Sequence, residues 1–141
     1  MTNLTKNLTL AIAALAMAAG TASAQSMKAE IPFAFRIGKK VMQPGEYRVH
    51  RQSGSQAPMF TLASLDSHQS AIVVASYRGA PSKEWADAGQ AKLSFLCGDG
   101  PCTLTRVWAG AGDAYTFHST PAKDGGDARV AEITLRPDRA N

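Results

Sequence analysis

The chain has 141 residues, of which 45% are hydrophobic and 18% charged, and its formal net charge is +4. Without its first 24 residues, which have a pattern of their own, 117 remain (141 − 24), the size of one domain rather than two. Such a chain buries roughly two thirds of its unfolded surface, enough for a hydrophobic core without metal ions. Its two cysteines are too few for a closed zinc site. No later segment is apolar for the roughly 20 residues of a membrane-spanning helix, which excludes a membrane span.

The N-terminal segment has the pattern of a secretory signal peptide. A polar start with Lys6 precedes an apolar stretch over residues 8–19, and the small-residue site Ala22-Ser23-Ala24 follows. The apolar stretch is about a dozen residues long, too short for a membrane anchor, so cleavage after Ala24 is favoured. We therefore expect residues 1–24 to be removed and a single β-rich domain with a frayed C-terminal tail, residues 25–141, to be released into the periplasm or outside the cell.

The start of the mature chain has a hydrophobic period of mostly two, which predicts β-strands. Apolar residues alternate with others over 31–37, and Pro32 places this strand at an edge or beside a bulge because proline cannot donate a ladder hydrogen bond. Gly38-Lys39 predicts a tight turn, and Pro44-Gly45 fits the central positions of a type II turn. A further strand with one polar face is predicted over residues 46–51.

The middle of the chain predicts a hairpin followed by a break. Residues 59–65 and 69–77 are expected to pair across the turn 66–68. Within the second of these strands, residues 71–75 are apolar on both faces, which favours a central strand. Glycines and a proline then interrupt the pattern, and Ser82 caps at most one helical turn.

The clearest hairpin joins strands over 92–97 and 102–108 through the four turn-forming residues 98–101. Cys97 and Cys102 flank this loop, which would bring their Cα atoms within disulfide range, and an exported chain meets oxidising conditions. We therefore expect a structural disulfide. The usual spacing of a redox-active pair is C-x-x-C, which this pair lacks.

The fold class follows from the number and spacing of these strands. Further short strands are predicted around Tyr115 and Phe117 and over residues 130–135. The sequence has no internal repeat and no long helical pattern. We expect an all-β fold, a small antiparallel β-sandwich or open β-barrel of about seven to eight short strands.

Two segments carry a resemblance: I-P-F-A-F-R-I-G over residues 31–38 and M-Q-P-G-E-Y-R-V over residues 42–49. They resemble the openings V-P-F-x-F-x-V-G and L-P-A-G-x-Y-x-V of a group of small exported bacterial β-rich proteins of unknown function. The segment L-T-R-V-W over 104–108 is similar to a later hairpin of that group, which ends in a V-W pair. Gln43-Pro44 stands where the group has P-A, and the two cysteines stand where aromatic residues are common. The resemblance implies a fold and brings no activity with it.

Positive charge is concentrated near the start of the mature chain. Residues 25–58 have a net charge of +4 (6 − 2), whereas residues 59–127 have −2 (5 − 7). This segment and a loop tryptophan expected to be exposed form a candidate binding surface, made of Arg36, Lys39, Lys40, Arg48 and Trp85. It suits an anionic envelope polymer or another envelope protein, and the alternative is a solvated strand face. No aromatic series runs among the cations for base stacking, which excludes nucleic acid.

No pattern in the sequence names a reaction. His50, His68 and His118 lack metal-ligand spacing, and no G-x-S-x-G motif occurs. We expect no cofactor and a non-enzymatic β module with a binding or structural role at the cell envelope. The alternative is a small envelope enzyme or metal-handling protein whose site is assembled only in the fold. A binding module should expose an aromatic or basic patch, and an enzyme should have a cleft with converging titratable groups.

Overall fold

The computed structural model describes residues 26–52, 57–119 and 128–138, so the expected signal peptide and the last three residues lie outside the described chain. The strands are β1 (Ser26–Ile31), β2 (Phe35–Ile37), β3 (Lys40–Met42), β4 (Gly45–Gln52), β5 (Met59–Ser64), β6 (Ser70–Gly79), β7 (Lys92–Cys97), β8 (Cys102–Trp108), β9 (Ala114–Phe117), β10 (Arg129–Thr134) and β11 (Arg136–Pro137). One helix, α1 (Lys83–Ala88), interrupts them. The all-β expectation is confirmed, with more strands than predicted.

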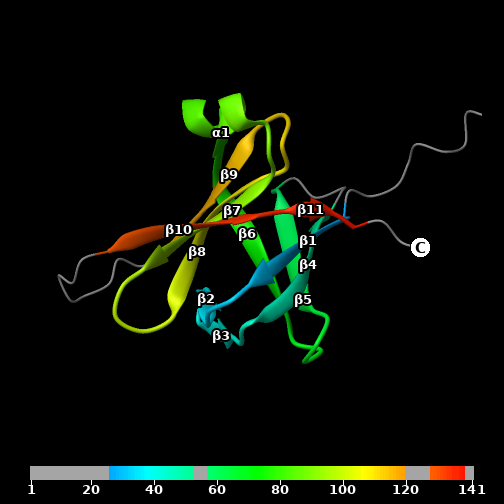
Figure 1. Cartoon of the computed structure of the whole chain (residues 1–141), viewed down its shortest axis with the longest axis vertical. Helices are drawn as coiled ribbons and strands as arrows, with labels where there is room; N and C mark the ends of the chain where they lie inside the picture. The colour runs from blue at the N-terminus through cyan, green and yellow to red at the C-terminus, as the bar shows by residue number, and fades with distance from the viewer. Residues whose placement is uncertain (1–25, 53–56, 120–127, 139–141) are drawn as a thin grey trace, which may run out of the picture.

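The strands form one open, mostly antiparallel sheet in the order β10-β7-β8-β9-β6-β5-β4-β1-β11. β2 lies off this path, pairing with β3 and, in parallel, with β8. The two end strands, β10 and β11, are separated only by Leu135, so the C-terminal segment pairs with β7 at one end and with β1 at the other. The sheet therefore curves round an interior as an open barrel (Figure 1).

Two predicted details near the start of the domain are wrong. The strand expected over 31–37 is divided into β1 and β2, because Pro32 lies between them. The expected type II turn at Pro44-Gly45 is absent: Gly45 begins β4 with a φ of +156°, far from the roughly +80° of that turn. A Cβ atom on Gly45 would lie 2.8 Å from Oδ2 of Asp66, so the close approach of this side chain requires glycine.

The core consists of side chains from the inner faces of the strands, with aromatic rings at its centre. The ring of Phe35 meets those of Tyr47 and Phe95 edge-on, at centroid distances of 5.1 and 5.4 Å. Phe60 contacts Phe117 in the same way at 5.7 Å. These pairs join strands from the whole length of the chain, as the predicted period of two requires.

The predicted central strand is only partly as expected. β6 lies in the middle of the strand order and pairs with β5 as predicted, but Ile72 and Val74 are 61% and 50% exposed. Its inner residues, Val73 among them, pack on the core, whereas its outer face is open.

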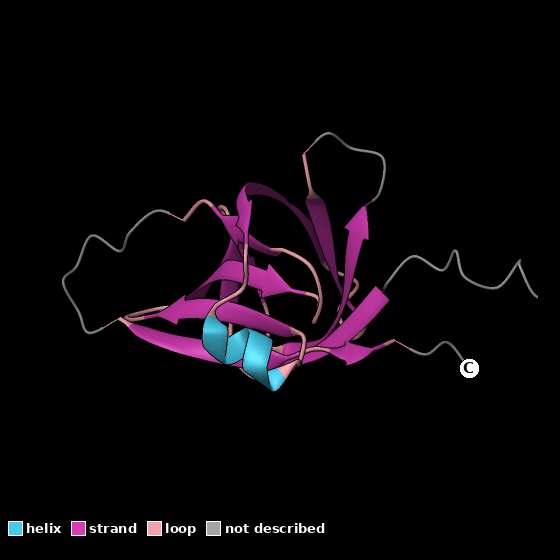
Figure 2. Cartoon of the chain, turned by 90° about the horizontal axis from the view of Figure 1, so that it is seen from above, coloured by secondary structure: helices cyan, strands magenta, loops and turns pink. Residues whose placement is uncertain are grey.

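The helix predicted to begin after Ser82 is present as α1, but its six residues make it longer than the single turn expected. The Ser82 hydroxyl accepts a hydrogen bond from the Trp85 backbone N–H, and Gly89 ends the helix with a φ of +65°. α1 lies on the outside of the strands (Figure 2), at the end of the molecule opposite β2 and β3 (Figure 1).

Candidate functional site

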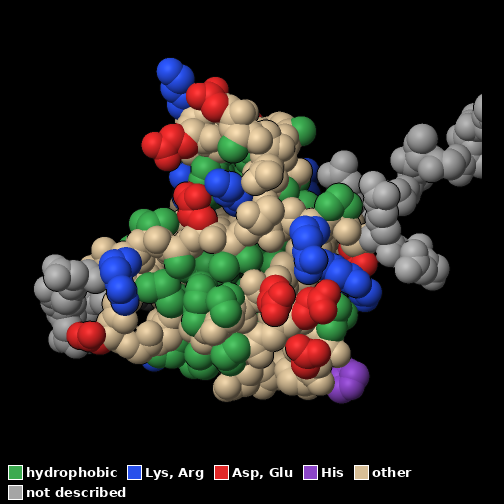
Figure 3. All heavy atoms as spheres, in the orientation of Figure 1, with side chains coloured by type: hydrophobic (Ala, Val, Ile, Leu, Met, Phe, Trp, Pro, Cys, Tyr) green, Lys and Arg blue, Asp and Glu red, His purple; other side chains and the backbone are tan. Residues whose placement is uncertain are grey.

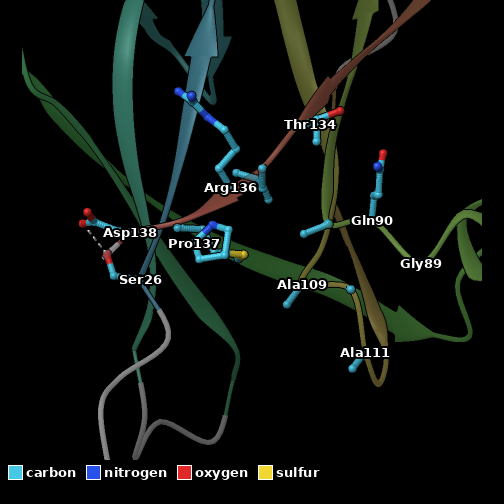
Figure 4. A pocket seen from close by; sticks show the side chains of 13 residues that line it. Ser26, Gly89, Gln90, Ala109, Ala111, Thr134, Arg136, Pro137 and Asp138 are labelled. Carbon is cyan, nitrogen blue, oxygen red and sulfur yellow. Dashed lines mark hydrogen bonds between the residues drawn. The ribbon is translucent and has the colours of Figure 1, made fainter. Parts of the chain in front are cut away.

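A groove of about 750 Å³ lies where the C-terminal segment passes from β7 to β1 (Figure 4). Its walls also include the start of β1 and the loops 89–91 and 109–111. The apolar or small lining residues are Met27, Gly89, Ala91, Ala109, Gly110, Ala111, Leu135 and Pro137, and the polar ones are Ser26, Gln90, Thr134, Arg136 and Asp138. The size and the mixed lining are typical of a small binding pocket.

Two backbone hydrogen bonds hold the C-terminal segment over the groove. Leu135 N–H donates to the Ala91 carbonyl at 2.8 Å, and Asp138 N–H donates to the Ser26 carbonyl at 3.0 Å. These bonds fix both walls, because one ties the segment to the start of β7 and the other to the start of β1.

Asp138 is the centre of an ion-pair cluster at one end of the groove. Its carboxylate lies 2.6 Å from Arg48 Nε and 3.3 Å from Lys28 Nζ, and its side chain is only 8% exposed. The Arg48 hydrogen bond, followed by that of Lys28, lowers the pKa of Asp138 below its ordinary value. The two ion pairs therefore fix the position of the Asp138 carboxylate and order this part of the groove wall.

Trp85 is placed differently from the expectation. It was expected to be an exposed loop residue, but it lies on α1 with 2% of its surface exposed. Its ring stacks on Trp108 at 6.4 Å, the Arg106 guanidinium lies over the ring at 4.5 Å from its centroid, and its indole N–H donates to Glu132 at 2.9 Å. This hydrogen bond is the main cause that lowers the pKa of Glu132. Trp85 therefore fastens α1 to the strands and is not a surface anchor.

The four predicted surface cations do not form one patch with it. Arg36, Lys39 and Lys40 lie together on the β2–β3 hairpin, and Lys40 Nζ donates to the Ser70 carbonyl. Arg48 lies on β4 and is bound to Asp138. The hairpin lies at the opposite end of the molecule from α1 (Figure 1). The predicted binding residues are therefore separated in the fold, because the β2–β3 hairpin, β4 and α1 lie at different places round the barrel.

The structure also exposes large apolar side chains on strands β3, β6 and β10. They are Val41, Ile72, Val74, Tyr77 and Val130. The sequence indicates exposed apolar side chains only where an apolar residue falls on the expected outer face of a period-two strand, as at residues 72 and 74. That signal is ambiguous, since a strand buried on both faces shows the same pattern.

The two cysteines and the three histidines do not combine into a metal-binding site within the described residues. Cys97 and Cys102 are at disulfide-bonding distance with Cα atoms 4.2 Å apart, as expected. The histidines lie apart along the chain: His50 is on β4, His68 is in the turn before β6, and His118 follows β9. Within the described residues, no group of three His, Cys, Asp or Glu side chains is arranged to hold a metal ion. No described helix is long and apolar enough to cross a membrane.

No family model, no curated protein and no solved structure matches the chain. The resemblance to the group of small exported β-rich proteins therefore stays a prediction.

Proposed function

We propose that the protein is an exported, non-enzymatic β module that binds another envelope protein in the groove beneath its C-terminal segment. The observation that carries this proposal is the groove itself, whose walls are tied to both ends of the sheet by the Leu135 and Asp138 backbone hydrogen bonds. A preformed groove loses little conformational entropy when a partner enters, which favours binding.

The lining favours a protein partner over an anionic polymer. Its charged side chains are Arg136 and Asp138, and Asp138 is already bound to Lys28 and Arg48. The remaining lining consists of small apolar groups and neutral hydrogen-bonding groups, which suit a protruding loop or side chain of a protein. A polymer with repeated negative charges would need a row of free cations, whereas the predicted cations are dispersed over two regions.

Location in the envelope is supported by two independent features. The sequence begins with the pattern of a cleavable signal peptide, and Cys97 and Cys102 are at disulfide distance. Such a pair persists in an oxidising compartment. The whole proposal therefore concerns a partner that the protein meets after export.

A capture experiment with a matched pair of variants tests the groove. Ala111→Trp fills it, and Ala80→Trp adds the same side chain to an exposed loop residue outside it. Wild type and Ala80→Trp, immobilised after purification from the host, should retain the same envelope protein from envelope extract, and Ala111→Trp should lose it. The proposal fails if no protein is retained, or if Ala111→Trp retains it as well as the control does while both variants melt at the same temperature as wild type.

A further inference from the structure

β10 is an edge strand with one unoccupied side. It pairs with β7 and stands at the end of the strand order, and no second partner strand exists among the described residues. It is also more exposed than its neighbour: Arg129, Val130, Glu132 and Thr134 are exposed, whereas β7 is largely buried. Edge strands that lie open in this way are templates for pairing with a further chain.

Two hydrogen bonds establish which backbone groups of β10 face the open side. Leu135 N–H points to the β7 side, where it meets Ala91, and Asp138 N–H points to the β1 side, where it meets Ser26. Backbone groups alternate between the two sides along an antiparallel strand. The N–H and C=O groups of residues 129, 131 and 133 therefore pair with β7, and those of residues 130, 132 and 134 face away from it.

Further along the C-terminal segment, at residues 136–137, the side that is open in β10 is occupied by a partner strand. β11 pairs there with β1, with Arg136 opposite Lys28 and Pro137 opposite Met27. From this point β1 and β10 diverge, as Figure 1 shows. Among the described residues, this edge of the segment is used by β1 at residues 136–138 and has no strand partner at residues 130–134, although β1 still approaches β10 where the two strands begin to diverge.

Partly exposed apolar side chains lie beside the free edge. Ala131 and Ile133 pack on the core without being fully buried, and so does Phe33. The Phe33 ring meets Phe95 at 5.1 Å, and Phe95 is the partner of Ala131 in the β7–β10 ladder. Figure 3 shows apolar side chains gathered across this face, below β10 and over β2 and β8. An added strand would cover them.

We infer that β10 binds an extended peptide segment of a partner protein by antiparallel strand addition. The peptide's backbone pairs with residues 130, 132 and 134, and apolar side chains at alternate positions cover Phe33, Ala131 and Ile133. It runs in the direction of β1, which is antiparallel to β11 on the same edge. This inference concerns a different surface from the groove and does not rest on the proposed function.

A separate peptide fits the edge better than a second copy of the chain. Two β10 strands paired about Glu132, the centre of the free edge, would place two carboxylates directly opposite each other, and the cation 3.4 Å from each, Lys92, lies on its own chain. Like charges in that position are unfavourable. A peptide with neutral residues has no such conflict.

Hydrogen exchange of single amides is the first test, because it reads the free edge without any ligand. In the free protein, the amides of residues 130, 132 and 134 should exchange much faster than those of 131 and 133. Equal protection of both sets would show that the edge already has a partner within the chain, and would overturn the inference.

Peptide binding is the second test. The probe is a short, capped, fluorescent peptide that alternates valine and threonine between terminal lysines. It should bind saturably, and binding should slow exchange at residues 130, 132 and 134. A probe N-methylated on its threonine amides, which would face β10, should bind about tenfold more weakly or worse, whereas methylation of the valine amides should matter little. The inference fails if the two methylated probes bind equally.

A matched pair of proline variants tests the same edge from the protein side. Val130→Pro removes an N–H that faces the open side, so the variant should fold but bind the probe about tenfold more weakly or worse. Ala131→Pro removes an N–H that pairs with β7, so it should lower the melting temperature far more. Equal melting temperatures for the two variants would contradict the alternation. A concentration-dependent dimer of the probe-free protein that Val130→Pro abolishes would show a second copy on the edge and overturn the inference.

Discussion

The β7–β8 hairpin and the C-terminal segment 129–138 are held in place by contacts of opposite range. The hairpin joins strands that are neighbours in sequence, and its two cysteines are five positions apart. The C-terminal segment instead contacts β1 across the whole domain: Ser26 and Asp138, which are 112 positions apart, share a side-chain hydrogen bond. The hairpin is a local structure, whereas the C-terminal segment takes its place only when the barrel has formed.

The two regions also differ in role: the β7–β8 hairpin supports the fold, whereas the C-terminal segment contributes to both surfaces proposed for binding. These surfaces are the groove and the free edge of β10, and the hairpin strands contribute to them mainly through the pairing of β7 with β10. Substitutions in the two regions should therefore differ in size, in range and in whether they affect binding.

The largest effect is expected at the point where the C-terminal segment changes partner. Leu135 is 4% exposed and belongs to the core cluster, so Leu135→Ala should lower the free energy of unfolding by about 2–5 kcal/mol. Urea denaturation measures this loss. The control Val130→Ala, at a side chain that is 67% exposed, should change it by less than about 0.5 kcal/mol. Equal losses of unfolding free energy for the two variants would mean that Leu135, between β10 and β11, is not a packed part of the core.

The disulfide of the hairpin comes next. Replacing both cysteines, Cys97→Ser with Cys102→Ser, should lower stability by about 2 kcal/mol, because the closed loop is short and restricts the unfolded chain only modestly. The melting temperature should fall by roughly 5–10 °C and the fold should survive. Labelling of protein isolated from the host, without reductant, should find no free thiol. Two reactive thiols would contradict the expected structural disulfide.

A smaller effect is expected where α1 meets β10. Trp85→Phe keeps a ring in the buried position but removes the indole N–H that Glu132 accepts, so stability should fall by about 1 kcal/mol. Glu132→Gln keeps an acceptor for the same N–H and serves as the control in chemical denaturation. A larger loss for Glu132→Gln than for Trp85→Phe would show that the charge of Glu132 matters more than its hydrogen bond to Trp85.

The smallest effect concerns acid stability at the end of the C-terminal segment. The pKa of Asp138 is lowered in the folded protein by Arg48 and Lys28, so its ionised form stabilises the fold. This contribution is complete above the ordinary aspartate pKa of about 4 and is lost as the pH falls through the lowered value. It should be small because both partner cations, Lys28 and Arg48, are solvent-accessible, and ion pairs screened in this way contribute little.

A melting series over the acid range tests this linkage. Asp138→Asn should melt at a slightly lower temperature than wild type near neutral pH, and the difference should shrink as the pH falls below about 4. The control Glu84→Gln, at an exposed residue outside the ion pairs of the described chain, should keep the wild-type difference between neutral and acid pH. A constant gap between Asp138→Asn and wild type at every pH would assign its effect to something other than the charge.

The predictions that succeeded and failed divide mostly along the same line, with the local turn at Pro44-Gly45 as an exception. The hairpin across Cys97 and Cys102 and the helical turn after Ser82 were predictable, because turn residues and a capping hydroxyl act over a few positions. The burial of Trp85 was not, since its contacts Trp108 and Glu132 lie 23 and 47 positions away (108 − 85 and 132 − 85). A tryptophan between glycines and prolines has the same local pattern whether or not a sheet covers it.

What the sequence by itself determined about this protein is its period-two strands, its all-β class and the one covalent link expected in it, because side-chain alternation and turn chemistry are properties of short segments. Only the tertiary structure decided that the predicted cations lie apart, that Asp138 meets Lys28 and Arg48, and that β10 keeps an open edge beside a groove. These features depend on how far each strand diverges from its neighbour as the sheet curves, and that curvature comes from the packing of the whole core.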